Sequence, residues 1–375
     1  MRQLTLFATS IALITALAAP SFAQKKAAKA DGIDRIDRTA GGALANVTVV
    51  KEDFNSVSYR KKGSARIVTI PAEQVVDIVR GVTPQPLREG KSKVLSGDLK
   101  GAVAPLQVAA RNATPWVKVY ANFYLGEAFR KLGRTDDAVR AYEAVIAAKA
   151  DSRFLPAARL GIARSWTAGA KYGKAQGVLE SFVREVDAKR IHRQYALKAK
   201  QALGANLAAR GKYSEASREY DSVITEAKSL AGRAKEAGEK ARLHLLGLRA
   251  ERDKGSALIK DKKYNDANRI FSRLASSRND PLARAIGMMG QGELSLAQGD
   301  ADLARVQLSE VTALGFSAEE ERPRALRLLA ECYLALKGKE KGAETLAAAY
   351  INDLLTHHPG TEAAKAARGL QQKLK

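Results

Sequence analysis

Four histidines and one cysteine are the residues of this chain best suited to bind a metal or to act as a nucleophile: His192, His244, His357, His358 and Cys332. A zinc site needs such ligands at a defined spacing, such as the two histidines of His-Glu-x-x-His on one helix face. The histidines of this chain do not have that spacing, and adjacent residues of an ordered turn point apart. Cys332 lies in Leu-Ala-Glu-Cys-Tyr-Leu, where a buried helix face favours a small core residue over a reactive thiol. We therefore predict no bound metal.

Motifs that bind nucleotides or activate a serine are absent from the sequence. The chain contains no Walker loop, no Gly-x-Ser-x-Gly turn and no Gly-x-Gly-x-x-Gly after a predicted strand. We therefore predict that the protein holds no cofactor and is not an enzyme.

Aromatic residues beside lysines are the remaining candidates for a chemical role. They recur near predicted helix starts or hairpin turns, and three of them follow a lysine: Trp116, Trp166, Tyr172, Tyr213 and Tyr264. A stripe of aromatic and basic side chains would suit an anionic polymer, whereas a tyrosine at a helix turn can also serve packing. We favour packing.

A recurring pattern defines the elements that would position any binding site. From residue 97 onward, a Gly is followed by an Ala five residues later, a bulky apolar residue four further, and another small or apolar residue three after that. Looser copies carry only the later positions. The alanines of the six copies are Ala102, Ala138, Ala175, Ala216, Ala267 and Ala304. An ordinary Ala-rich helical bundle has no reason to keep one offset over six copies, so the pattern predicts stacked helical hairpins.

The two best copies resemble tetratricopeptide repeats, a family of helical hairpins of about 34 residues. One copy contains Leu125-Gly126, Phe129, Gly133, Ala138 and Tyr142, and another contains Leu203-Gly204, Leu207, Gly211, Ala216 and Tyr220. Small residues at these positions let paired helices approach to about 8–10 Å. The spacing between copies is longer than the family norm, and residues 222–252 predict extended helices. We expect a mainly α fold over residues 87–375: a solenoid of about seven hairpins that ends in a polar capping helix.

The resemblance also implies where a ligand would lie, because tetratricopeptide proteins usually bind ligands in the groove lined by the first helix of each repeat. Transferred to the two best copies, this partner-binding groove would contain Tyr120, Phe123, Glu127, Arg130, Lys198, Gln201 and Ala205.

Residues 31–82 show a different pattern, with short segments that alternate and are rich in branched residues. Strands are predicted at residues 45–50, 56–60, 65–70 and 75–79, with turn signals between them. So small a unit protects its edges most simply by closing its sheet, so we expect a small β-barrel. The segment resembles SH3-like and Sm-like barrels in pattern. Two prolines in residues 83–86 make this stretch a connector to the helices.

The N-terminus has the features of a secretory signal: a charged start, an apolar run from Leu4 to Ala18, and small residues before Gln24. We expect a signal peptide at residues 1–23, cleaved between Ala23 and Gln24, and a disordered basic lead-in at residues 24–30. The rest of the chain contains no second long apolar stretch, so no transmembrane segment is expected after cleavage. These features predict a periplasmic or secreted protein.

Lys and Arg outnumber Asp and Glu by 63 to 40, a formal charge of +23. Nucleic acid is the usual partner of so basic a chain, but the export signal argues against it, and we expect no nucleic-acid partner. The sequence as a whole predicts a non-catalytic adaptor or scaffold that binds a protein or peptide in the bacterial cell envelope. The alternative is an electrostatic binder of an anionic envelope polymer such as peptidoglycan or lipopolysaccharide. Cations gathered on one face would favour the polymer, and a groove with apolar lining and few charges would favour a protein.

Overall fold

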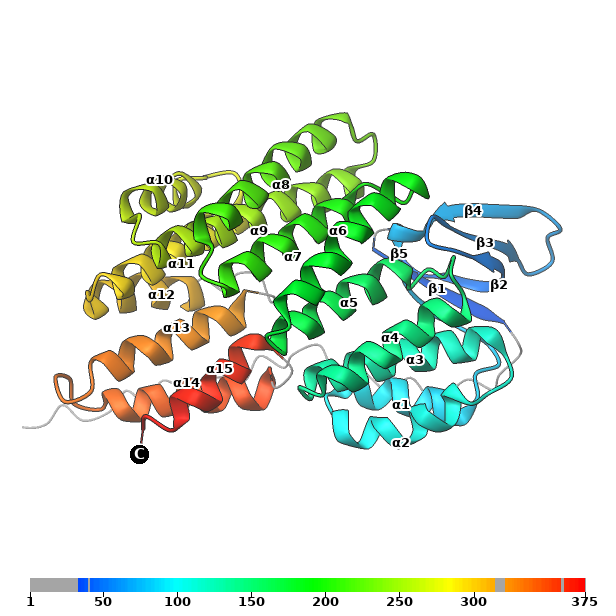
Figure 1. Cartoon of the computed structure of the whole chain (residues 1–375), viewed down its shortest axis with the longest axis horizontal. Coiled ribbons are helices and arrows are strands. Elements are labelled where there is room, and N and C mark those ends of the chain that lie inside the picture. The colour runs from blue at the N-terminus through cyan, green and yellow to red at the C-terminus, as the bar shows by residue number, and fades with distance from the viewer. Residues whose placement is uncertain (1–32, 40, 314–320, 359–360, 375) are drawn as a thin grey trace, which may run out of the picture.

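The structure is a computed structural model that describes residues 33–39, 41–313, 321–358 and 361–374. Within these residues the chain forms an N-terminal five-stranded sheet followed by fifteen α-helices. Figure 1 shows the helices stacked into a solenoid, with the strands at one edge beside the N-terminal helices. The predicted signal peptide and basic lead-in lie outside the described residues.

The sheet is antiparallel throughout, in the order β4-β3-β2-β1-β5. Its strands are β1 (Asp34–Arg38), β2 (Leu44–Glu52), β3 (Ser56–Lys61), β4 (Ile67–Pro71) and β5 (Val75–Val79), and a 3-10 turn, η1 (Ala72–Gln74), precedes β5. No backbone pairing joins β4 to β5 among the described residues, so the strands form a five-stranded antiparallel sheet, and the barrel remains a prediction. Neighbouring solenoid helices cover part of the sheet.

Strand β1 was missing from the predicted strands, although it lies between β2 and β5. Its sequence, Asp-Arg-Ile-Asp-Arg, contains a single apolar residue, so no alternation of apolar residues marks it. That residue, Ile36, is fully buried among apolar side chains of the other strands. Four of its residues are charged, and one of them, Asp34, accepts a hydrogen bond from the backbone amide of Val49 at 2.8 Å.

Seven helical hairpins follow, as the repeat pattern predicted, and a final helix closes the solenoid. The hairpins are α1 (Gln85–Ser96) with α2 (Leu99–Ala110), α3 (Pro115–Lys131) with α4 (Thr135–Ala148), α5 (Leu155–Ala168) with α6 (Tyr172–Ala188), α7 (Gln194–Ala209) with α8 (Tyr213–Arg233), α9 (Ala237–Lys260) with α10 (Tyr264–Ala275), α11 (Pro281–Ala297) with α12 (Ala301–Ala313), and α13 (Arg322–Ala335) with α14 (Ala343–His357), followed by α15 (Glu362–Gln371). The first helix begins two residues before the predicted boundary, because Pro86 fits its first turn. The odd-numbered helices contact one another along the solenoid.

The small residues of the pattern hold aromatic rings between neighbouring hairpins. Tyr142 of α4 is fully buried, and a Cβ atom built on Gly126 of α3 or Gly161 of α5 would lie 2.6 or 2.4 Å from its ring. Gly204 stands in the same relation to Tyr220, at 2.6 Å. The six alanines of the pattern are all buried to 0% exposure. The glycines and alanines are thus places where helices meet without room for a larger side chain.

The recurring Gly five residues before each alanine has a backbone role. Gly133 ends α3 in a left-handed conformation with φ of 75°, which lets the chain turn directly into α4. The looser copies make the same turn without glycine, since Ala170 and Lys262 take φ values of 55° and 59°. The hairpin geometry is therefore kept where the sequence signal is lost.

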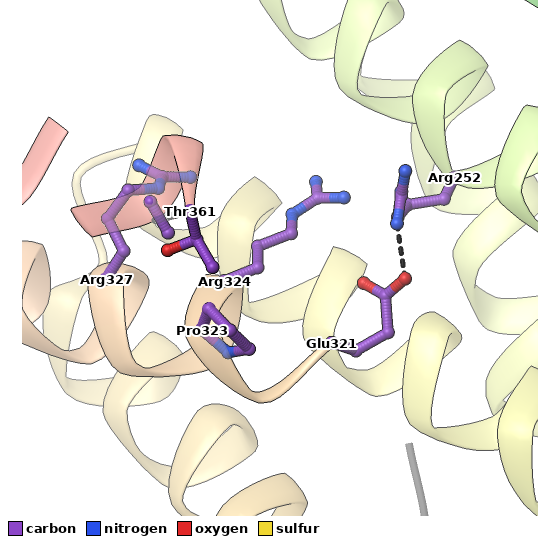
Figure 2. Close-up of a pocket in the computed structure, with 7 residues that line it drawn as sticks. Arg252, Glu321, Pro323, Arg324, Arg327 and Thr361 are labelled. Atoms are coloured by element: carbon purple, nitrogen blue, oxygen red, sulfur yellow. Dashed lines mark hydrogen bonds and ion pairs between the residues drawn. The ribbon is translucent and has the colours of Figure 1, made fainter. Parts of the chain in front are cut away.

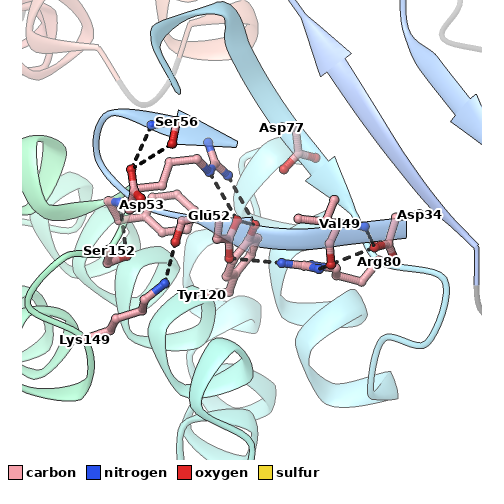
Figure 3. A network of polar contacts seen from close by, with 12 residues as sticks. Asp34, Val49, Glu52, Asp53, Ser56, Asp77, Arg80, Tyr120, Lys149 and Ser152 are labelled. Atoms are coloured by element: carbon pink, nitrogen blue, oxygen red, sulfur yellow. Dashed lines mark hydrogen bonds and ion pairs between the residues drawn. The ribbon is translucent and has the colours of Figure 1, made fainter. Parts of the chain in front are cut away.

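The sheet docks on the N-terminal ends of several odd-numbered helices. Figure 3 shows Glu52 accepting a hydrogen bond from the Tyr120 hydroxyl of α3, at 3.0 Å, and the Lys149 ammonium donating to the Glu52 carbonyl. Further along the solenoid, η1 reaches α9, because the Gln74 side chain donates to Glu236 at 2.5 Å. The sheet therefore contacts hairpins far apart in the sequence.

Candidate partner-binding groove

A cleft of about 740 Å³ lies on the inner side of the solenoid. Its walls come from the middle and C-terminal parts of α3, α5, α7 and α9, and α15 contributes from the other end of the chain. Eight lining residues are basic and two are acidic: Arg130, Lys131, Arg164, Lys198, Arg249, Arg252, Lys365 and Arg368, against Asp253 and Glu321. We call this cleft the basic groove.

Four of the seven residues predicted for the groove line it: Arg130, Lys198, Gln201 and Ala205. Glu127 lies beside it, where its carboxylate accepts from Arg130 at 2.9 Å and from the Tyr142 hydroxyl at 2.5 Å.

Tyr120 and Phe123 lie elsewhere, since the N-terminal half of α3 is covered. Tyr120 is only 2% exposed and bonds to the sheet, while Phe123 stacks on Phe154 with ring centroids 4.3 Å apart. The part of the family groove that these two residues would form is therefore occupied by the protein itself.

The sequence analysis missed several groove residues, above all Arg164 and the basic side chains of α9 and α15. Arg164 was not reached because it lies on α5, outside the two copies from which the groove residues were transferred. The residues of α15 had no such signal. Lys365 and Arg368 reach the groove because the last helix packs against α13 and α14 and brings its basic side chains back toward α3 and α5.

Burial and like charges depress the pKa values of cations in the groove. Burial lowers the pKa of Lys198 to about 8, and the neighbouring Arg164, Arg249 and Arg242 add to this effect. The pKa of Arg164 is lowered by loss of hydration and then by Arg130, although its side chain remains open to solvent. Burial and the neighbouring Arg252 lower the pKa of Arg249. A bound anion would relieve this repulsion.

Lys198 should therefore make stability depend on pH in the alkaline range. Below about pH 8 the lysine is protonated in both states and its charge destabilises the fold. Between about pH 8 and 10 the unfolded chain binds more protons at this site than the folded protein, so stability rises with pH. We expect a Lys198→Met variant to be more stable than wild type at pH 7 by about 2 kcal/mol, and the gap to shrink by pH 10. Urea unfolding at pH 7 and pH 10 measures this difference, with the exposed Lys228→Met as the control. A stability difference between Lys198→Met and wild type that is the same at both pH values would contradict the prediction.

The cations of a smaller pocket next to the groove are paired with acids. Figure 2 shows an adjoining pocket of about 340 Å³ in which Arg252 pairs with Glu321 and Arg324 stands near Thr361. Arg324 pairs with Glu293, and Arg327 with Glu331. This pocket therefore carries little net charge for a ligand.

The cysteine and two of the histidines considered at the outset for chemistry are buried or lie beside acidic side chains. Cys332 is fully buried, and burial raises the pKa of its thiol to about 12. His192 lies 3.2 Å from Glu239 and His244 2.5 Å from Asp280. Within the described part of the chain, no three His, Cys, Asp or Glu side chains gather closely enough to hold a metal. None of the described helices is long and apolar enough to cross a membrane.

Comparison with known proteins agrees with the repeat geometry. Residues 120–152, which span α3, α4 and the turn between them, match the family model described as "Tetratricopeptide repeat". By this match the hairpin is similar to a tetratricopeptide repeat. The described residues as a whole form a tetratricopeptide-like α-solenoid with a small antiparallel sheet at its N-terminal end.

Several solved structures are similar in fold. The quorum sensor NprR from B. thuringiensis, in its apo form, is 13% identical, with 77% of this chain and 86% of that chain covered and a TM-score of 0.47. A tetratricopeptide repeat protein from Parabacteroides merdae is 16% identical, with 77% and 97% covered and a TM-score of 0.48. The apo form of RapI is 11% identical, with 77% and 98% covered and a TM-score of 0.49. No curated protein matches the sequence.

Proposed function

We propose that this protein is a non-catalytic adaptor of the bacterial cell envelope that holds a segment of a protein partner in the basic groove. The observation that carries the proposal is the shape and mixed lining of the groove, a concave site of about 740 Å³ in which small and uncharged residues lie among the charged ones. Its remaining lining is small or uncharged, including Ala163, Ala202 and Ala205, which leaves room for a chain to lie against the helices. The envelope location is supported by the secretory features of residues 1–23.

A second candidate is an electrostatic binder of an anionic envelope polymer such as peptidoglycan or lipopolysaccharide. The gathering of eight cations in one groove favours it. The small and uncharged residues of the lining favour the protein partner, because a polypeptide offers apolar side chains and backbone amides as well as charges. The two candidates therefore differ in what should be found in the groove and in how it responds to salt.

Site-specific photocrosslinking in cells tests the adaptor. A photoreactive amino acid is placed at Ala205, which lines the groove, or at Gly177, which faces open space on α6. We expect a discrete protein adduct from position 205 only, and the same partner to survive purification at high salt. Adducts equal at both positions, or only polyanionic material that salt removes, would contradict the adaptor.

The mass of the mature chain, isolated from the periplasm, checks cleavage near Gln24.

A further inference from the structure

The hairpin of β3 and β4 carries a cluster of cations around its turn. From Asn55 to Ala72 the chain contains no acidic residue. Four basic residues lie in the same segment: Arg60, Lys61, Lys62 and Arg66. All four are exposed, and none of their side chains forms an ion pair or a hydrogen bond with a residue that the structure describes. We call these four residues, together with the neighbouring Ile67, the basic tip.

The basic tip is held in shape by backbone hydrogen bonds and projects from the molecule. The amide of Lys62 donates to the Asn46 carbonyl at 2.8 Å, and that of Ser64 donates to the Lys61 carbonyl at 3.0 Å. Gly63 takes a left-handed φ of 78°, and a Cβ atom built on it would meet nothing within 4 Å. Figure 1 shows the turn between β3 and β4 extending beyond the helices, at the end of the molecule opposite the C-terminal helices. A broad, flat surface can therefore reach it.

An exposed apolar side chain lies among these cations. Ile67 pairs with Arg60 in the strand register, on the face of the hairpin that points away from the buried Tyr59. Its exposed fraction is 54%. Cations on an edge strand also prevent its pairing with the edge of another sheet, but that role requires no exposed isoleucine. The tip therefore has two properties that a partner should match, positive charge and an accessible aliphatic group.

This combination favours a lipid bilayer over a soluble polyanion. The charged groups of a polymer would match the cations alone. A bilayer with anionic headgroups offers negative charge at its surface and an apolar layer directly beneath, so it matches both Arg60 and Ile67. None of the described residues that line the basic groove belongs to the sheet, so the tip is a separate surface.

We propose that the basic tip docks the protein on the surface of a membrane that contains anionic phospholipids. The four cations lie against the headgroup phosphates, and the Ile67 side chain enters the boundary between headgroups and acyl chains. So small a contact gives a reversible attachment that salt weakens. The docking does not depend on what the groove binds, so the two functions can be tested apart.

Co-sedimentation of the mature protein with lipid vesicles tests the docking. Vesicles of phosphatidylcholine with phosphatidylglycerol supply negative charge, and vesicles of phosphatidylcholine alone are the neutral comparison. We expect binding to the anionic vesicles to be about tenfold tighter and to fall as salt rises. Equal binding to the two kinds of vesicle would overturn the proposal. Binding to insoluble peptidoglycan but to neither vesicle would also overturn it, and would assign the cations to a polymer.

Matched double variants assign the binding to the tip. Lys61→Gln with Lys62→Gln removes two cations from the turn, and Arg184→Gln with Arg218→Gln removes two from exposed positions on α6 and α8. One cation near an anionic surface contributes about a fivefold factor, so we expect the first pair to lose about 20-fold in vesicle affinity and the second less than about twofold. Equal losses would contradict the docking. So would a tip variant that forms dimers yet binds vesicles like wild type, since its cations would then only protect the sheet edge.

Ile67 separates bilayer docking from a purely electrostatic contact. Ile67→Ser keeps all four cations, and we expect it to lose about fivefold in affinity for the anionic vesicles, because part of an aliphatic side chain is no longer buried. Val306→Ser on α12 is the control, since this residue is 61% exposed and lies outside the tip. If Ile67→Ser binds the vesicles as tightly as Val306→Ser, the insertion of Ile67 into the bilayer is wrong.

Discussion

Replacing Glu52 with alanine is expected to lower the free energy of unfolding by about 3–5 kcal/mol, because it leaves buried cations without their counter-charge. Glu52 is 9% exposed at the junction of sheet and solenoid. Its carboxylate lies 3.2 Å from Arg80 and 3.7 Å from Arg153, and it accepts from Tyr120 at 3.0 Å. Arg80 retains Asp34 at 3.4 Å, so the uncompensated charge falls mainly on Arg153, whose side chain is 8% exposed.

Urea unfolding followed by circular dichroism measures the loss, with Glu143→Ala on the exposed face of α4 as the matched control. The control should change stability by no more than about 0.5 kcal/mol. Removing both charges in Glu52→Leu with Arg153→Met should recover part of the loss, since a buried pair is replaced by apolar side chains. If Glu52→Ala is no worse than Glu143→Ala, the junction network does not stabilise the protein.

The second large effect is expected from Gly287→Ala in α11, which should destabilise the protein by about 3 kcal/mol through overpacking. A Cβ atom at this position would lie 2.1 Å from the backbone nitrogen of Ala275 and 2.6 Å from the carbonyl oxygen of Phe271. These are backbone atoms of α10 and cannot rotate away as a side chain could. The helices must separate, and the fully buried Phe271 ring loses contacts.

Gly177→Ala is the control, because a Cβ atom there meets nothing within 4 Å. It should stabilise α6 by up to about 1 kcal/mol, the ordinary gain of alanine over glycine in a helix. Thermal unfolding of the two variants should thus shift in opposite directions. Shifts of the same sign and size would show that α10 and α11 are not closely packed at Gly287.

The solenoid could be predicted from sequence because its signal is steric and local. A residue such as Ala138 or Gly126 must be small where two helices meet, so small residues recur at this position in the sequence of the repeats. The groove was half predicted for the same reason: Arg130 and Lys198 occupy positions that the repeat register fixes. Arg164 lies on α5, outside the two copies on which that argument rested.

The other features of the fold and the groove depend on contacts between segments distant in the sequence. Such contacts produce no periodic pattern of residues. Nothing in the sequence around Tyr120 shows that the sheet covers it, since its partner Glu52 is 68 residues away. The return of α15 to the groove depends on the summed rotation of seven hairpins. The cover that the solenoid gives to part of the sheet likewise depends on distant contacts that the sequence does not show.

The docking of the sheet along the solenoid has a consequence for how the molecule unfolds. A simple repeat array is held by nearest-neighbour interfaces, so it can unravel from its ends one unit at a time. Here the segment around η1 also binds Glu236 of α9, and Thr39 lies 3.4 Å from Arg242, 203 residues away. Because these bonds join hairpins that a simple array would leave unconnected, we expect the second to the fifth hairpin to unfold as one cooperative unit. We expect the same tether, which lies outside the repeats, to limit changes in the pitch of the superhelix.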